Sequence, residues 1–222
     1  YRQKILAPFF AHHLKGEGGF NLPRAQTFQT GSNEWKSYPA WPPKEGVEKR
    51  RLYLHPDGKL SFAPPPALGT PFDAYTSDPA RPVPYRYRPI DPTFASRTWP
   101  IWEVLDQRVA HLRPDVLSWE TEPLTEDITV TGEVLANLFA STSGTDSDWI
   151  VKLIDVYPEH IQDNPKMGGF QLMVAGEVLR GRFRNSFERP EPIAPGKVEK
   201  YVIDMNSINH RFLKGHKIMV QV

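Results

Sequence analysis

The 222-residue sequence contains no cysteine, and this absence excludes several classes of chemistry. Without thiols the chain can form no disulfide, no cysteine-ligated zinc site and no thiolate nucleophile. The sequence also lacks any apolar run near the roughly 20 residues that a membrane-spanning helix needs. Its formal net charge of +1 creates no overall field toward nucleic acid or an anionic membrane. We therefore expect no nucleic acid and no membrane among its partners.

Sequence motifs of catalysis and cofactor binding are missing as well. There is no Gly-x-Ser-x-Gly nucleophile elbow. The glycines at positions 16, 18 and 19 follow a helical pattern and lack the Lys-Ser/Thr ending of a phosphate loop. The adjacent His12 and His13 are expected to point to different sides of that helix, which would not suit one metal ion. The sequence thus predicts no catalytic, cofactor-binding or metal-binding residue and no cofactor.

Proline, in contrast, is abundant: the chain has 23 prolines, which crowd between positions 39 and 100. Aromatic residues are interleaved with them, which favours a long extended segment. These aromatics could form a sugar-stacking face, or they could anchor irregular crossings by burying large side chains. We favour anchoring, because aromatics in a loop-rich segment mostly pack. The set is Trp35, Tyr38, Trp41, Tyr53, Phe62, Tyr75, Tyr85, Tyr87, Trp99 and Trp102.

The N-terminal half of the chain combines one helical pattern with short strands. In residues 1–15, apolar side chains recur at three- and four-residue spacing from Ile5 to Leu14, and Gly16 is a typical helix end. This apolar stripe has no partner helix nearby, so we expect it to pack against a body outside the chain. Residues 26–30 and 51–54 are expected to be short strands, with a hairpin turn at Asp57-Gly58.

The C-terminal half shows longer strand patterns. Many β runs with few helices favour an antiparallel sandwich. In the last run, Ile218, Val220 and Val222 share one face and should point into the sandwich. The expected strands cover residues 116–120, 128–140, 149–157, 170–184, 198–204 and 216–222.

Asp146 and Asp148 alternate within a turn rich in serine and threonine. Alternating acids in a loop can supply oxygen ligands for calcium. The alternative is a hairpin-like connection in which short polar side chains bond local backbone and Trp149 begins a buried strand. We favour the connection, because no bidentate Glu follows at ligand spacing.

Arg180, Arg182 and Arg184 alternate with Gly181 and Phe183. Period two would place the three guanidinium groups on one face of a sheet. Pairing with carboxylates is favoured over binding of a phosphate, and the candidate partners are Glu177, Glu188 and Asp204.

Several segments together resemble a known domain. Residues 115–124, 128–132, 145–153, 179–184 and 215–222 are similar to the C-terminal jelly-roll domain of the X-Pro dipeptidyl-peptidase and cocaine esterase family of serine hydrolases. Within that family, α-amino-acid ester hydrolases and glutaryl cephalosporin acylases look closest. Residues 27–35 resemble the strand that opens the domain. Residues 9–16 resemble the last helix of the preceding α/β-hydrolase domain.

The resemblance implies an all-β fold, a galactose-binding-like jelly-roll β-sandwich over residues 17–222 that is incomplete at its end. Residues 1–16 would be the last helix of a missing α/β-hydrolase domain. The family's Ser-His-Asp triad would lie before Tyr1, so no catalytic residue is transferred to this chain. We exclude His111, His210 and His216 as the triad base, because no nucleophile and no orienting acid accompany them in the sequence.

The function implied is that of a non-catalytic C-terminal sandwich, which packs on the α/β-hydrolase domain of the same protein and helps to shape its acyl pocket. The parent's substrate would be a small-molecule ester, amide or peptide, its location periplasmic or secreted, and a homo-oligomer is compatible with it. The alternative is a free-standing carbohydrate- or ligand-binding jelly-roll module, which a flat exposed row of Trp and Tyr would favour. A cupin-type metal enzyme would need a His/Glu set that the sequence lacks.

Overall fold

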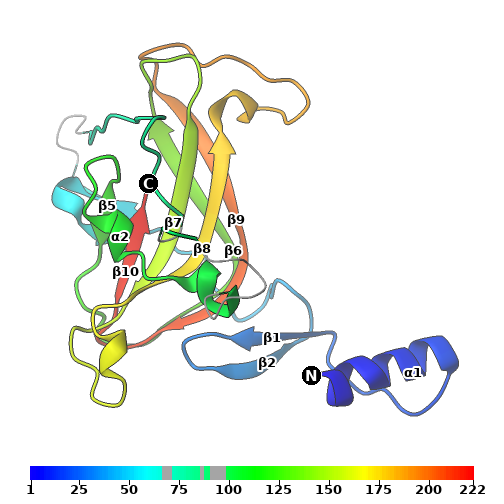
Figure 1. Ribbon diagram of the computed structural model, residues 1–222. Coiled ribbons are helices and arrows are strands. Elements are labelled where there is room, and N and C mark those ends of the chain that lie inside the picture. The colour runs from blue at the N-terminus through cyan, green and yellow to red at the C-terminus, as the bar shows by residue number, and fades with distance from the viewer. Residues whose placement is uncertain (67–71, 86–87, 91–98) are drawn as a thin grey trace.

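The computed structural model describes residues 1–66, 72–85, 88–90 and 99–222, and its dominant feature is an antiparallel β-sandwich (Figure 1). One sheet has four strands in the order β5-β10-β7-β8, and the facing sheet pairs β6 with β9. This confirms the predicted all-β class. The strand bounds are β5 Ser118–Glu120, β6 Ile128–Ala140, β7 Asp148–Val156, β8 Gln171–Arg180, β9 Glu199–Phe212 and β10 Lys217–Gln221.

Shorter elements surround the sandwich. The hairpin β1–β2 is antiparallel and lies against one end of the β6–β9 sheet, and a second small hairpin pairs β3 with β4 around the predicted Asp57-Gly58 turn. The bounds are β1 Ala25–Gln29, β2 Glu34–Tyr38, β3 Tyr53–Leu54 and β4 Leu60–Ser61; α1 Ala7–Lys15 and α2 Arg108–His111; the π-helical turn Arg2–Leu6; and the 3₁₀ turns Pro56–Gly58, Trp99–Val104, Pro165–Met167 and Gly181–Phe183.

Helix α1 confirms the predicted N-terminal helix, although its first residues form a π-helical turn. Gly16 ends it in the left-handed conformation, with φ 68°. No residue of α1 is buried, and Leu14 is 75% exposed. His12 and His13 were predicted to point to different sides, and this is wrong: their rings meet edge to face with centroids 4.9 Å apart. Both also pack against Phe20.

Strand β9 is longer than the sequence pattern predicts. It runs on from the expected end at residue 204 through Asn206, which has φ 66°, and continues to Phe212. Its pairing with β6 shifts register between Glu133 and Leu135, so that both strands stay paired through the irregularity. The segment 209–212, which was not among the predicted strands, is therefore the last part of β9 and pairs with residues 128–131 of β6.

Strand β8 ends earlier than expected, because Gly181 begins a 3₁₀ turn. A Cβ at Gly181 would lie 2.5 Å from Ile193 Cδ1, so a larger residue here would displace the end of the Ile193 side chain. The prediction that three arginines share one sheet face is therefore wrong. They do pair with carboxylates, but not with the expected ones: the pairs are Arg180–Asp148, Arg182–Asp146 and Arg184–Glu199.

These ion pairs also show what the acidic turn does. Asp146 accepts from the Arg182 backbone and guanidinium, and the carboxylate of Asp148 faces Arg180 at 2.8 Å. Thr142 bonds the local backbone at Gly144, as the connection hypothesis predicts. Trp149 is buried at the start of β7. The turn thus ties β7 to the end of β8.

The sandwich interior is apolar, and the final strand contributes to it as predicted. Ile218 is buried, and Val220 and Val222 pack against the same core. Strand β10 is central, with β5 on one side and β7 on the other. Val222 itself exchanges two backbone hydrogen bonds with Leu117. The largest fully buried apolar side chains are Tyr201, Phe212, Ile154, Ile193, Ile203 and Met219.

Most of the aromatic side chains of this set that the structure describes are half-buried, which fits the anchoring hypothesis: Tyr38, Trp41, Tyr53, Phe62 and Tyr75. Trp35 and Tyr85 are exposed instead. Tyr87 and the side chains of Trp99 and Trp102 lie outside what the structure describes.

Candidate functional site

A buried carboxylate lies between two imidazoles at one end of the sandwich interior. Asp155 on β7 has an exposed fraction of 0%. Its Oδ2 is 3.2 Å from Nε2 of His210 on β9, and its Oδ1 is 2.8 Å from Nδ1 of His216, which precedes β10. Two histidines from the C-terminal part of the chain therefore meet a carboxylate that lies 55 and 61 residues before them.

The carboxylate of Asp155 determines which nitrogens of the two neighbouring imidazoles carry hydrogen. An ionised carboxylate only accepts, so both facing imidazole nitrogens carry hydrogen and donate. Burial acts to raise the pKa of Asp155, but the hydrogen bonds from His210 and His216, with the charges of both rings, outweigh it. The pKa of Asp155 is therefore held below its ordinary value.

The second nitrogen of His210 extends the cluster to the β1–β2 hairpin. The Thr30 hydroxyl lies 2.7 Å from His210 Nδ1, to which it donates when the ring is neutral. The expectation that no orienting acid accompanies His210 is thus wrong, since Asp155 faces it, and Thr30, His210 and Asp155 form a hydroxyl–imidazole–carboxylate series. The His210 ring is 1% exposed, so its nitrogens serve these two partners rather than a substrate.

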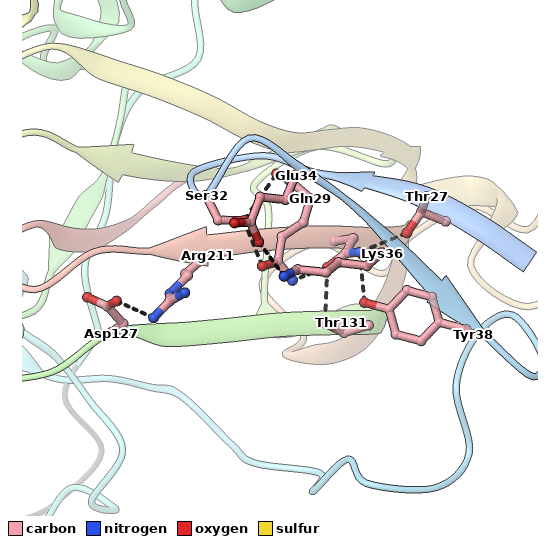
Figure 2. A network of polar contacts seen from close by, with 10 residues as sticks. Thr27, Gln29, Ser32, Glu34, Lys36, Tyr38, Asp127, Thr131 and Arg211 are labelled. Atoms are coloured by element: carbon pink, nitrogen blue, oxygen red, sulfur yellow. Dashed lines mark hydrogen bonds and ion pairs between the residues drawn. The ribbon is translucent and has the colours of Figure 1, made fainter. Parts of the chain in front are cut away.

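Asn209, the neighbour of His210 in β9, points to the opposite face of the sheet and meets the hairpin there. Its Nδ2 donates to Thr27 Oγ1 at 2.7 Å and to Tyr38 Oη at 2.9 Å. Its Oδ1 accepts from Gln29 Nε2 at 2.8 Å and from Thr131 Oγ1 at 3.2 Å. Both donors and both acceptor positions of this amide are therefore used (Figure 2).

Asn209 and its partners Thr27, Gln29, Tyr38 and Thr131 form the Asn209 cluster. Further charged and polar side chains surround this cluster (Figure 2). Ser32 donates to Gln29 Oε1 at 2.8 Å and so fixes the orientation of that amide. Arg211 pairs with Asp127 at 2.6 Å beside the hairpin. Lys36 pairs with Glu34 across the same face of β2, and this pair lowers the pKa of Glu34.

Backbone contacts complete the attachment of the hairpin. Thr30 N donates to Asn209 O at 3.1 Å, and Arg211 N donates to Thr30 O at 2.8 Å. Gly31 follows with φ 86°, and a Cβ there would lie 2.0 Å from the carbonyl oxygen of Arg211. The close approach of the two backbones therefore requires glycine at this position.

The opposite face of the hairpin carries an aromatic pair. Phe28 and Trp35 are directly paired across the two strands, and their rings meet edge to face at 5.5 Å. They are 43% and 53% exposed. The hairpin thus has one face bonded to the sandwich and one apolar face that is open.

The other residues considered from the sequence do not join this cluster. His111 on α2 accepts from Gln171 Nε2 at 2.6 Å.

Within residues 1–66, 72–85, 88–90 and 99–222, no group of three or more His, Asp or Glu side chains is arranged to hold a metal ion. The same residues include no helix with the length and apolar character of a membrane span.

The fold and the cluster define a β-sandwich module whose buried polar residues join strands and position a hairpin. The chain belongs to the family of X-Pro dipeptidyl-peptidase C-terminal non-catalytic domains, which matches residues 18–222.

Three known proteins illustrate the similarity. Cocaine esterase from Rhodococcus sp. (strain MB1 Bresler) is 33% identical over 96% of this chain. A solved aminopeptidase from a marine-sediment Thaumarchaeota archaeon is 47% identical over 99% of the chain, with a TM-score of 0.92. A solved α-amino acid ester hydrolase is 45% identical over 99% of the chain, with a TM-score of 0.91. The chain spans 36% of the length of each of these relatives.

Proposed function

We propose that residues 17–222 are the non-catalytic sandwich of a serine hydrolase of the acyl ester, acyl amide or dipeptidyl-peptidase type. Residues 1–16 would then be the last helix of its catalytic α/β-hydrolase domain. The observation that carries this proposal is the family match over residues 18–222. Two solved relatives with 47% and 45% identity, named as an aminopeptidase and an α-amino acid ester hydrolase, support it further.

The sandwich packs on the catalytic domain and helps to shape its acyl pocket. Exposed apolar side chains at the N-terminal end of the chain support the packing. Phe9, Phe10 and Leu14 of α1 are all exposed, and so are Phe28 and Trp35 of the hairpin. Exposed apolar side chains that gather on one part of a protein mark a contact with another surface.

Further strands of the same protein would complete the sandwich. The four-stranded sheet faces only two strands, and among the described residues no strand pairs with the second edge of β6. A groove of about 3390 Å³ opens along that edge and is lined by core residues including Val130, Leu138, Met205 and Phe212. An unpaired edge beside an apolar groove is a site for strand addition.

A free-standing sugar-binding module would need a flat aromatic platform. The exposed pair Phe28 and Trp35 has 68° between its ring planes and presents an uneven surface. The hydrolase interpretation therefore accounts better for this pair.

The acyl-pocket role can be tested in the full-length protein with an activated-ester inhibitor that acylates the serine and carries a diazirine in its acyl part. After illumination, the proposal predicts label on a peptide from residues 1–222, in addition to the acylated serine outside them. Label found only outside residues 1–222 would contradict the role in the acyl pocket. An acylated serine inside residues 1–222 would contradict the proposed function as a whole.

A further inference from the structure

Successive residues of the β1–β2 hairpin point to opposite faces, so its polar and aromatic side chains lie on different faces. Thr27 and Gln29 point to the sandwich, where they bond Asn209. Phe28 lies between them in sequence and therefore points to the other face, opposite Trp35. One hairpin thus presents a polar face to the sandwich and an aromatic face away from it.

The aromatic face is apolar surface that a folded protein rarely leaves open. About half of each ring of Phe28 and Trp35 contacts solvent, and the two rings contact one another at 5.5 Å. Aromatic side chains, tryptophan above all, are enriched at the centres of protein interfaces, where their burial contributes much of the binding free energy.

The pair is also held in a fixed position before any partner binds. Four side-chain hydrogen bonds converge on Asn209, and two backbone hydrogen bonds hold Thr30 between Asn209 and Arg211. A surface that is already ordered loses little conformational entropy on binding, so its contacts contribute more fully to affinity. This arrangement suits a permanent contact between domains.

The position of the hairpin in the chain indicates its occupant. The family is that of a C-terminal domain, so the catalytic part of a family member precedes the sandwich in sequence. The hairpin is the first β element, and α1, with exposed Phe9, Phe10 and Leu14, comes directly before it. Figure 1 shows α1 and the hairpin at the same end of the molecule, beyond the sandwich. The relatives also contain nearly two-thirds of their length outside the matching part.

We infer that the β1–β2 hairpin is a two-sided connector, fixed to the sandwich through Asn209, and that its Phe28–Trp35 face is a docking surface for the catalytic domain of the same protein. This inference rests on the proposed function and adds the surface through which the two domains meet. Asn209 acts as a positioning residue, because it sets the direction in which the aromatic pair faces.

The test uses the full-length protein with p-benzoylphenylalanine at position 28, which keeps an aromatic ring on the hairpin. A second protein carries the same residue at position 139, because Phe139 is 72% exposed on the outer face of β6, far along the strand from Thr131. Thermal melting followed by circular dichroism checks that both proteins are folded. After illumination, peptide mass spectrometry identifies the crosslinked segments.

The inference predicts crosslinks within one polypeptide from position 28 to peptides outside residues 1–222, about tenfold more than from position 139, because benzophenone reacts only with groups in contact. Crosslinks from position 28 to a second copy of the protein would overturn it. Crosslinks to outside peptides from position 139 but not from position 28 would overturn it while leaving the proposed packing of the two domains intact. No crosslink to outside peptides from either position would contradict both.

Discussion

The Nε2 of His210 lies 3.2 Å from the Oδ2 of Asp155, and this contact joins β9 to β7 inside the sandwich. Asn209, one residue earlier, points to the other side of the same sheet and holds the β1–β2 hairpin. Two consecutive residues therefore couple the sandwich interior to the hairpin outside it. The stability of the domain and the position of the hairpin should depend on the same few side chains.

Asn209→Ala should lower the free energy of unfolding by about 3 kcal/mol, since it removes four hydrogen bonds and leaves buried partners unsatisfied. Asn137→Ala is the matched control, because Asn137 is exposed on β6, and its effect should stay within about 0.5 kcal/mol. Urea unfolding of both variants measures the difference. Equal effects would show that the Asn209 cluster does not hold the hairpin.

Gly31→Ala should lower the free energy of unfolding by about 4 kcal/mol or prevent docking of the hairpin, because the new Cβ would lie 2.0 Å from Arg211 O. Gly18→Ala is the control that distinguishes this steric clash from the strain of a non-glycine residue at positive φ. Gly18 also has a positive φ, 70°, but nothing lies within 4 Å of the added Cβ. The control should lose about 1 kcal/mol. Thermal melts that rank the two variants equally would refute the close backbone contact.

Acid should destabilise the domain through Asp155. The pKa of Asp155 is lower in the folded state than its ordinary value of 3.8, so its contribution to stability is complete above that value. This contribution disappears as the pH falls through the folded pKa. Asp155→Asn should be less stable at pH 7 and should show a flatter loss of stability below pH about 4.

Urea unfolding between pH 7 and pH 3 measures this dependence. Asp57→Asn, in an exposed turn, controls for the simple removal of a carboxylate. If the Asp155 variant keeps the full acid dependence of the parent, the paired carboxylate is not its source.

On the proposed function, the edge of β6 that no described strand pairs should make residues 1–222 aggregate more readily than the full-length protein. Leu135→Lys places a charge on β6, where Leu135 is 52% exposed, and should slow aggregation. Ile150→Lys places the same charge on β7, which is paired with β10 on one side and β8 on the other, at a residue with 49% exposure. Light scattering during heating should distinguish the two. Equal effects would indicate that aggregation does not begin at β6.

The sequence was sufficient to predict three of the longer strands. Alternating apolar residues gave the bounds of β6, and apolar runs located β7 and β10, because buried faces impose a period of two. The end of β8 was missed, because the turn that begins at Gly181 packs closely against Ile193 only in the fold. That neighbour comes from a different part of the chain.

The buried cluster was beyond sequence reasoning for a similar reason. Thr30 and His210 are 180 residues apart, and no local pattern connects them. One signal was present: Asp155 is an acid on the face of β7 whose other residues, Trp149, Val151 and Leu153, lie in the core. A charge at such a position requires buried partners. The sequence can therefore indicate that Asp155 has partners, but only the fold identifies His210 and His216.

The central claim is that this sandwich serves a catalytic site located elsewhere in the protein, and hydrolysis by purified residues 1–222 tests it most directly. Activated esters, aminoacyl esters and dipeptidyl amides should be hydrolysed at the rate of the buffer blank, while the full-length protein hydrolyses at least one of them. Hydrolysis by residues 1–222 that disappears in Thr30→Val or His210→Gln would contradict the account, because the Thr30–His210–Asp155 series would then be a catalytic centre.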